Sequence, residues 1–236
     1  MSDGWRMAFM FDARGGDHAV LEKGLAQAAE SIRRLAGDAQ VRLGVLDRSP
    51  ELNTRGDNES FDVARWRGVD GAVEITVPEA RAGALADIAA SVGRVVAGLA
   101  EPGSIEVMAG PMFAMVPPRD GEAFLSLAFK RYPGITSEDF RNWWRFRHAG
   151  VAIPVLGEDL LGYDQVHVDA AVTQTLARAA GVEPVAYDAY DNLTYVDTAG
   201  FLSSVTDLEG MARIAADEVG HIDNNSRRHA LMRRVG

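Results

Sequence analysis

Polar and aromatic side chains recur at regular spacing in one stretch of the second half, where they could carry out proton chemistry. A helix is predicted over 137–151, and Phe140, Trp144 and His148 lie four residues apart within it, so they share one face. His148 therefore ends an aromatic stripe, with Trp143 beside it. A neutral imidazole in apolar surroundings titrates near working pH and can act as a general base. A core histidine bonded to a carbonyl group is the alternative interpretation of this spacing.

A predicted strand over 161–168 adds further hydrogen-bonding groups. Its alternation places Tyr163, Gln165 and His167 on one face. Three polar side chains at period two indicate either a solvated edge of a sheet or the polar floor of a pocket. If this face meets the helix that carries His148, two imidazoles, a phenol and an amide converge between aromatic walls, which is the composition expected of a small-molecule site.

The order of predicted elements suggests how these residues are positioned. Each half of the chain has the order strand, helix, strand, strand, helix, strand. The expected elements are 7–12, 18–35, 41–46, 72–77, 79–99 and 104–116 in the first half, with a loop over 47–62, and 124–130, 137–151, 161–168, 191–196, 201–219 and 229–235 in the second, with a further helical stretch over 170–180. We therefore predict an α+β fold of two ferredoxin-like βαββαβ repeats, residues 1–118 and 119–236. Their bare sheet faces are expected to pack together as an α+β barrel within one chain, with the helices outside.

Composition narrows the class of protein. The chain has 236 residues, a formal net charge of −10 and no cysteine. Negative charge disfavours nucleic acid and anionic membranes as partners, and the lack of cysteine excludes disulfides and thiolate nucleophiles. No signal peptide and no apolar stretch of membrane-spanning length is recognised, so a cytoplasmic protein is expected. No H-x-x-x-H or H-E-x-x-H spacing occurs, and no metal site is predicted.

The second half resembles EthD-domain proteins. These read K-R-x-P-G-[LI]-[ST]-x-E-x-F, followed by a tryptophan and a histidine on a helix, and the run 129–149, FKRYPGITSEDFRNWWRFRHA, is similar to that pattern. The segment 162–167, GYDQVH, is similar to their next motif, Y-x-Q-x-H. The resemblance extends over 123–235, more loosely at 187–188, 217–218 and Asp223. The first half carries no such motif and is interpreted as a degenerate copy, with Ala28, Ala29 and Glu30 where the second half has His148, and with Val41, Leu43 and Val45 in place of the polar strand residues.

The resemblance implies the dimeric α+β barrel superfamily. That superfamily includes cofactor-free cyclases, decarboxylases, dehydratases and monooxygenases that act on aromatic or polyketide-like compounds. It assigns the family's helix histidine to His148 and the family's strand motif to Tyr163, Gln165 and His167. Many members carry an acid in the third strand, where this chain has Asn192. The resemblance therefore implies that a carboxylate for an imidazole is missing or comes from Asp188, Asp191 or Asp223.

The combined expectation is a lyase, dehydratase or cyclase that performs acid–base chemistry without a cofactor on a hydrophobic aromatic or polyketide-like small molecule. The expected catalytic residues are His148 as base with Tyr163 and His167 as proton donors, and the expected substrate-binding residues are Gln165, Phe140, Trp143, Trp144 and Asn192. One alternative is a haem-binding barrel of the chlorite-dismutase or dye-peroxidase type, with His148 or His167 as the iron ligand. Another is a non-catalytic carrier of a hydrophobic ligand. The chain is expected to be a monomer or a homodimer; the substrate and any contribution of the first half to the site stay open.

Overall fold

Eight β-strands close into one antiparallel barrel in the computed structural model, which describes residues 2–53 and 69–236. The strand order around the barrel is β1-β3-β2-β8-β5-β7-β6-β4. The first half supplies β1 (Gly4–Phe11), β2 (Gln40–Leu46), β3 (Gly71–Val77) and β4 (Glu106–Val116), and the second half supplies β5 (Ala123–Arg131), β6 (Leu160–His167), β7 (Ala189–Tyr195) and β8 (Ile222–Arg234). The predicted α+β barrel within a single chain is confirmed.

The two halves have the same strand order. The first half reads β4-β1-β3-β2 and the second reads β8-β5-β7-β6. Pairing of β2 with β8 and of β4 with β6 joins the two sheets into the closed barrel. The segment 117–122 links β4 to β5 at the junction. The division into repeats after residue 118 stays a prediction, because one continuous sheet runs through both halves.

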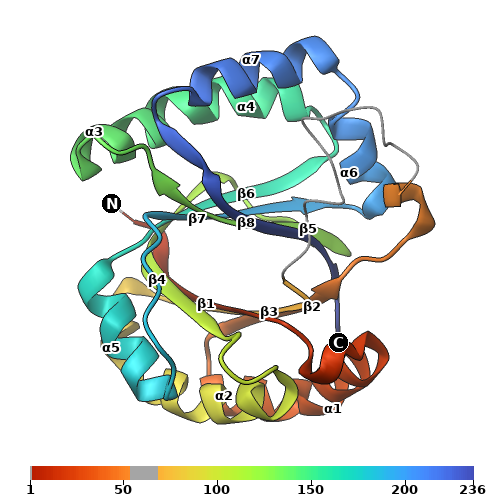
Figure 1. The fold of residues 1–236 in the computed structure, drawn as a ribbon, viewed down its shortest axis with the longest axis vertical. Helices are drawn as coiled ribbons and strands as arrows, with labels where there is room; N and C mark the ends of the chain where they lie inside the picture. Colours follow the sequence, from red (N-terminus) through yellow and green to blue (C-terminus); the bar gives the residue numbers. More distant parts are fainter. Residues whose placement is uncertain (1, 54–68) are drawn as a thin grey trace.

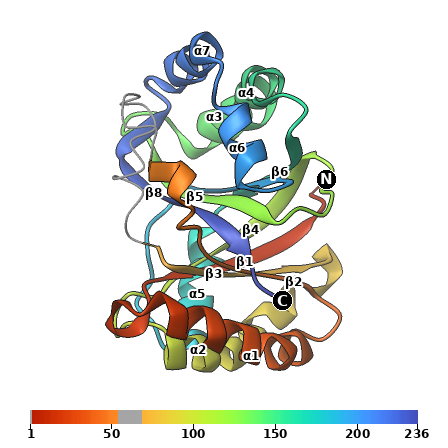
Figure 2. The same cartoon turned by 90° about the vertical axis from the view of Figure 1, so that its right-hand side faces the viewer.

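Helices cover the outer faces of the barrel in two layers (Figures 1 and 2). Helix α1 (His18–Ala36), the 3-10 helix η5 (Glu79–Ala84) and α2 (Leu85–Leu99) lie over the first half, and α3 (Ser137–Asn142), the π-helical segment η6 (Trp143–His148), α4 (Ala149–Leu156), α6 (Thr198–Ser204) and α7 (Leu208–Glu218) lie over the second. Short 3-10 turns, η1 (Arg14–Gly16) and η2 (Pro50–Asn53), lie in the first half. Part of the predicted loop 47–62 falls outside the described residues.

Helix α5 (Ala170–Ala180) crosses from the second half to the helix layer of the first. It follows β6 in the chain but packs beside α2 (Figures 1 and 2). The close approach depends on Gly93, since a Cβ added there would lie 2.8 Å from the Cβ of Ala180. Thr173 Oγ1 in α5 also accepts a hydrogen bond from the Ala109 amide of β4, at 3.1 Å. The two halves are therefore joined by a helix as well as by strands.

One described helix, Glu79–Leu99, is long and apolar enough to span a membrane by length and composition, contrary to the sequence expectation. Its buried residues recur at helical spacing: Leu85, Ile88, Ala89, Val92, Gly93 and Val96. They belong to the aliphatic core that also contains Phe9 of β1 and Val73 of β3. This pattern is that of a core helix packed on a sheet.

Several predicted boundaries in the second half are wrong. The helix predicted to end at residue 151 continues through Pro154 to Leu156 and begins after an N-cap at Thr136, whose side chain accepts a hydrogen bond from the Asp139 amide. The predicted helix 201–219 is two helices, because Asp207 starts a new N-cap with the Gly210 amide. Strand β8 begins at Ile222, seven residues before the expected start, since pairing with β5 continues across a bulge. The first part of this strand is rich in polar residues, so the sequence pattern did not predict it as strand.

Strand alternation separates two environments in the second half. On β6, Tyr163, Gln165 and His167 point toward the helices, while Asp164 and Val166 point into the barrel. On β2, the corresponding helix-facing residues Leu43 and Val45 join an aliphatic core. The helix-facing layer of the second half is thus the polar one, as the sequence predicted.

Candidate functional site

The π-helical turn changes which rings meet above the sheet. In a π-helix, hydrogen bonds run from residue i to i+5, so Trp143 rather than Trp144 lies against His148, with ring centroids 4.9 Å apart. The other face of this helix directs Trp144 onto Phe140 at 5.6 Å and onto His167 at 5.0 Å. The predicted face shared by Trp144 and His148 is therefore wrong. The π-turn divides the stripe into two stacks, each ending on a histidine.

His148 forms a buried dyad with Asp217 of α7. The distance from His148 Nδ1 to Asp217 Oδ2 is 3.1 Å, and both side chains are only 6% exposed. Burial lowers the pKa of His148, although Glu218 and Asp217 act in the opposite direction. The ring is then neutral near pH 7, with Nδ1–H donating to the carboxylate and the lone pair on Nε2. This tautomer is the one that a general base needs.

Asp217 was not among the carboxylates expected to serve a histidine. Asp188 instead forms an ion pair with Arg131 at 3.3 Å. The carboxylate of Asp217 also forms an ion pair with Arg147, whose Nε lies 3.0 Å from Asp217 Oδ1. The sequence feature that could have indicated Asp217 was the acidic pair 217–218 at the end of a predicted helix. This pair fits the EthD pattern only loosely.

A row of polar residues crosses the sheet beneath these helices. Gln165 pairs with Asp191, Asp191 with Leu127, and Leu127 with His229 on successive strands. Gln165 Nε2 donates to the Trp144 carbonyl at 3.0 Å and to the Tyr163 hydroxyl at 2.9 Å. The amide thereby ties the strand to the helix and orients the phenol, so Tyr163 and Gln165 act as one unit.

Asp191 is a buried carboxyl group in the middle of that row. Burial raises its pKa well above the ordinary value, the negative charge of Glu218 raises it further, and Arg227 opposes the shift. Burial likewise raises the pKa of Tyr163, with Asp191 adding to the effect. Tyr163 therefore holds its proton near pH 7, and the shift at Asp191 favours the protonated carboxyl group. The site combines neutral acids with a neutral base, as acid–base catalysis requires.

An ion pair between Glu218 and Arg227 lies beside both the base and the acid. Arg227 Nη2 donates to Glu218 Oε2, and charges on both residues influence the pKa values of His148 and Asp191. Neither residue was predicted for the site. In β8, alternation places Arg227 and His229 on the helix-facing side together with Leu231. The sequence would have indicated Arg227 as a site residue if the strand had been predicted from its true start.

His167 has a different environment from His148. Its ring lies beneath Trp144 and contacts the edge of Phe113 at 4.7 Å. Burial, with the nearby positive charges of Arg141 and Arg145, lowers its pKa to about 3. His167 therefore cannot supply a proton as an imidazolium near neutral pH. Its stacking instead fixes the position of Trp144.

Asn192 does not lie with the other predicted site residues. It is paired with Asp164 and points into the barrel, where its Nδ2 donates to Glu74 Oε1 at 2.6 Å. The interpretation of Asn192 as a substrate-binding residue of the helix-facing pocket is therefore wrong. The acid on the helix-facing side of this strand is its neighbour Asp191, because successive residues of a strand face opposite sides.

Several buried polar atoms between helix and sheet have hydrogen-bonding capacity left. Among the described residues no hydrogen-bond partner is found for Trp143 Nε1, Trp144 Nε1, Gln165 Oε1, His167 Nε2 and Asp191 Oδ1. Buried polar atoms are nearly always satisfied, so a concentration of such atoms marks a place for polar groups of a ligand. Outside, a cavity of about 530 Å³ between α4 and α7 reaches Asp217 past Val151, Pro154 and Val155.

The sequence of this region matches a known domain. Residues 132–225 match the profile of the EthD domain. This part of the second half is therefore similar to EthD domains. The match falls within the 123–235 resemblance and confirms it. That the first half is a degenerate copy stays a prediction. A search of curated proteins gave no match.

Solved structures share the fold of the whole chain at low identity. A protein described as a candidate monooxygenase from Fusobacterium nucleatum has a TM-score of 0.59 at 7% identity, over 100% of this chain and 94% of that chain. A chlorite dismutase mutant from Candidatus Nitrospira defluvii has 0.55 at 10%, over 100% and 92%, and an anthrone oxidase-like protein has 0.53 at 9%, over 100% and 94%. These proteins thus share the barrel fold of the whole chain, and the EthD match lies in its second half.

Metal and haem chemistry can be tested against the residues of the EthD domain. Across residues 2–53 and 69–236, no group of three or more metal-ligating side chains converges. His148, held by Asp217 through Nδ1, has the arrangement of an iron-ligating histidine. Its neighbours are the Glu218–Arg227 ion pair and Trp143, and the space over His167 holds Trp144. An indole therefore packs against each of the two imidazoles, and these residues leave no room for a porphyrin beside either ring.

Proposed function

We propose that this protein is an acid–base enzyme that removes a proton from a hydrophobic, aromatic carbonyl compound and eliminates water or closes a ring. The observation that carries the proposal is the buried His148–Asp217 dyad, with 3.1 Å between His148 Nδ1 and Asp217 Oδ2. A neutral imidazole with an oriented Nδ1–H is an efficient base at its Nε2. Reactions of this class need no electron carrier and no metal for proton balance.

The elimination can be written with each proton placed. His148 Nε2 takes the proton from the carbon beside the carbonyl group, and the resulting oxyanion accepts a hydrogen bond from a neutral acid. The bond from carbon to the departing hydroxyl breaks as Asp191 gives its proton, so that water leaves. Proton return from His148 to Asp191 restores both groups. Asp191 is suited to this role because burial and the negative charge of Glu218 raise its pKa and favour its protonated form.

The remaining groups position the substrate. Tyr163, protonated and held by Gln165 at 2.9 Å, would donate to the oxyanion. The indoles of Trp143 and Trp144 would form the aromatic wall, and Trp143 Nε1 has no hydrogen-bond partner among the described residues. Phe140 supports that wall from behind, since it is buried against both tryptophans. We propose that substrate approaches through the cavity between α4 and α7.

A proton-exchange assay tests the proposal through its first step alone, so the product need not be identified. The purified chain is incubated in heavy water with 2-tetralone and with tricyclic aromatic ketones, and deuterium uptake beside the carbonyl is followed by NMR. We expect catalysed uptake with at least one compound and a loss of about 100-fold or more in His148→Gln. His18→Gln is the matched control, because His18 lies in the first half beside Asp70.

Three results would overturn the assignment. Uptake that persists at the wild-type rate in His148→Gln would remove His148 as the base. Tight binding of these ketones with no exchange in any of them would instead favour a non-catalytic carrier. A Soret band in the purified protein would restore the haem alternative.

A further inference from the structure

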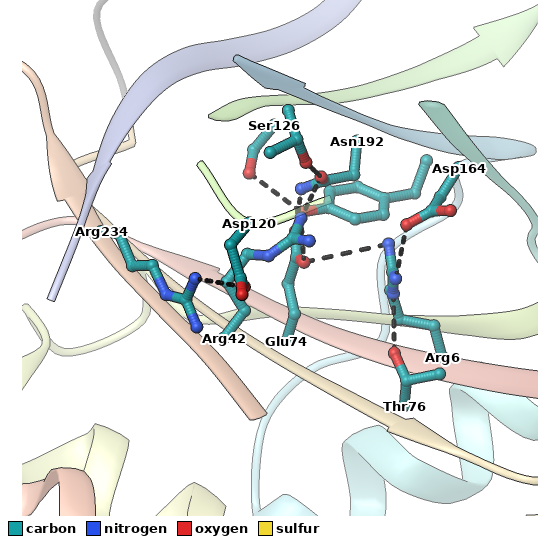
Figure 3. A network of polar contacts seen from close by, with 11 residues as sticks. Arg6, Arg42, Glu74, Thr76, Asp120, Ser126, Asp164, Asn192 and Arg234 are labelled. Atoms are coloured by element: carbon teal, nitrogen blue, oxygen red, sulfur yellow. Dashed lines mark hydrogen bonds and ion pairs between the residues drawn. The ribbon is translucent and has the colours of Figure 1, made fainter. Parts of the chain in front are cut away.

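A second cavity lies on the opposite side of the sheet, at one mouth of the barrel. Its volume is about 660 Å³, and strands β1 to β4 and the linker between the two halves supply most of its wall. Figure 3 shows the polar side chains that converge there. Its lining includes Arg6, Arg42, Glu74, Thr76, Arg119 and Arg234. The cavity is separated by the sheet from the His148–Asp217 dyad.

Arg6 is fixed in the floor of this cavity by two neighbours. Its Nε donates to Thr76 Oγ1 at 2.9 Å, and its Nη2 donates to Asp164 Oδ2 at 2.7 Å (Figure 3). The residue is only 4% exposed. Its Nη1 makes no hydrogen bond to any described residue and lies 3.9 Å from Glu74 Oε2. One donor of a rigid, buried guanidinium group is therefore available to a ligand.

Glu74 presents the complementary acceptor. Its Oε1 receives hydrogen bonds from Tyr190 Oη and from Asn192 Nδ2. Its Oε2 is buried, has no hydrogen-bond partner among the described residues, and lies 3.5 Å from Arg42 Nη1. The same carboxyl group is thus held firmly on one oxygen while the other faces the cavity. Arg6 Nη1 and Glu74 Oε2 thus form a long ion pair at 3.9 Å, and neither atom makes a hydrogen bond within the described residues.

The lining is positively charged although the chain is acidic. Arg6, Arg42, Arg119 and Arg234 line it against Glu74 and Asp120, in a chain whose formal charge is −10. Arg234 pairs with Asp120 at 3.2 Å. Asp164 lies behind Arg6 and balances one of these charges. An excess of guanidinium groups remains, which favours a small anion.

We propose that this barrel mouth binds a small hydroxycarboxylic acid. Its carboxylate would accept hydrogen bonds from Arg6 Nη1 and Arg42, and its hydroxyl would donate to Glu74 Oε2. The ligand is expected to carry a hydroxyl group because Glu74 Oε2 can accept a hydrogen bond. A ligand with negatively charged oxygens alone would be repelled by this carboxylate. Inorganic phosphate would place more negative charge against this carboxylate and is the poorer fit. The site is independent of the proposed function.

Calorimetry on the full chain with matched acids tests the proposal. Malate and succinate differ only by one hydroxyl group, and inorganic phosphate is the third probe. We expect malate to bind and succinate to bind more weakly by about tenfold or more, since succinate lacks the hydroxyl that donates to the charged Glu74. Phosphate should bind more weakly still. Equal binding of malate and succinate, or phosphate binding as tight as malate, would contradict the proposal.

Variants separate a ligand site from a structural ion network. Arg42→Gln should weaken malate about tenfold, and Arg178→Gln on α5 is the control, since Arg178 bonds only to Gln174 among the described residues. If Arg42→Gln fails to fold by circular dichroism, Arg119→Gln on the exposed rim takes its place with a smaller expected loss. No malate binding to the wild-type chain at millimolar concentration would show that the network only cross-links the strands.

Discussion

Asp217 Oδ2 lies 3.1 Å from His148 Nδ1 and joins the end of α7 to the end of the π-helical turn. The two residues are 69 positions apart in the chain. Their pairing sets the tautomer of the imidazole, while burial keeps the ring neutral. A histidine at the end of an aromatic stripe becomes a candidate base through this contact.

Asp191→Asn should stabilise the protein above neutral pH. The pKa of Asp191 is raised in the folded state, so its contribution to stability is complete below the unfolded value near 3.8 and is lost as pH rises through the folded value. Asparagine keeps the shape without this loss. We expect the melting temperature of the variant to exceed that of the wild type at pH 8 by more than at pH 5. Asp87→Asn, an exposed change on α2, should give no such trend; parallel curves for Asp191→Asn would contradict the assignment of a neutral acid.

His167→Phe should flatten the acid side of the stability profile. Burial lowers the pKa of His167 to about 3, so its contribution is complete above the unfolded value near 6.5 and is lost as pH falls toward about 3. The loss approaches roughly 5 kcal/mol at the limit. Phenylalanine keeps the stacking between Trp144 and Phe113 without a proton to bind. Urea titrations between pH 4 and 7 should show a shallower slope for the variant, and identical slopes would be evidence against a buried neutral imidazole.

The fold was more predictable than the site because alternation and helical spacing repeat over many residues. Both βαββαβ orders, the closed barrel and the helix-facing positions of Tyr163, Gln165 and His167 followed from such repeats. The π-turn did not, since it depends on one inserted step that shifts Trp143 onto His148. Asp217 and Arg227 were also missed. Long-range pairs of this kind leave no local pattern in the sequence.

Gly93→Ala and Gly98→Ala, both on α2, should have opposite effects on stability. A Cβ at position 93 would lie 2.8 Å from Ala180 Cβ and 3.0 Å from its Cα, whereas none of the described atoms lies within 4 Å at position 98. We expect a loss of about 1–3 kcal/mol for the first from overpacking between α2 and α5. The second should gain about 0.5 kcal/mol from helix propensity. Urea denaturation measures both, and equal effects would show that α5 does not pack on α2 as described.

The misplacement of Asn192 has a simple physical cause. Residues 191 and 192 lie on opposite faces of β7. The family resemblance aligned the acid position with Asn192, whereas the acid on the helix-facing side is Asp191, one of the three carboxylates considered as alternatives. Asn192 instead belongs to the network around Glu74 inside the barrel (Figure 3).

Nitrogen NMR of the imidazole rings tests the protonation state of the dyad without a substrate. In protein labelled at histidine nitrogens, His148 should carry its proton on Nδ1 at pH 7, with an unprotonated Nε2 and a pKa below the ordinary 6.5. Asp217→Asn should alter both the tautomer ratio and the pKa, whereas His18→Gln serves only to assign a signal. We predict an Nδ1–H tautomer that depends on Asp217. A cationic ring at pH 7, or an Nε2–H tautomer unaffected by Asp217→Asn, would contradict the role of His148 as the base.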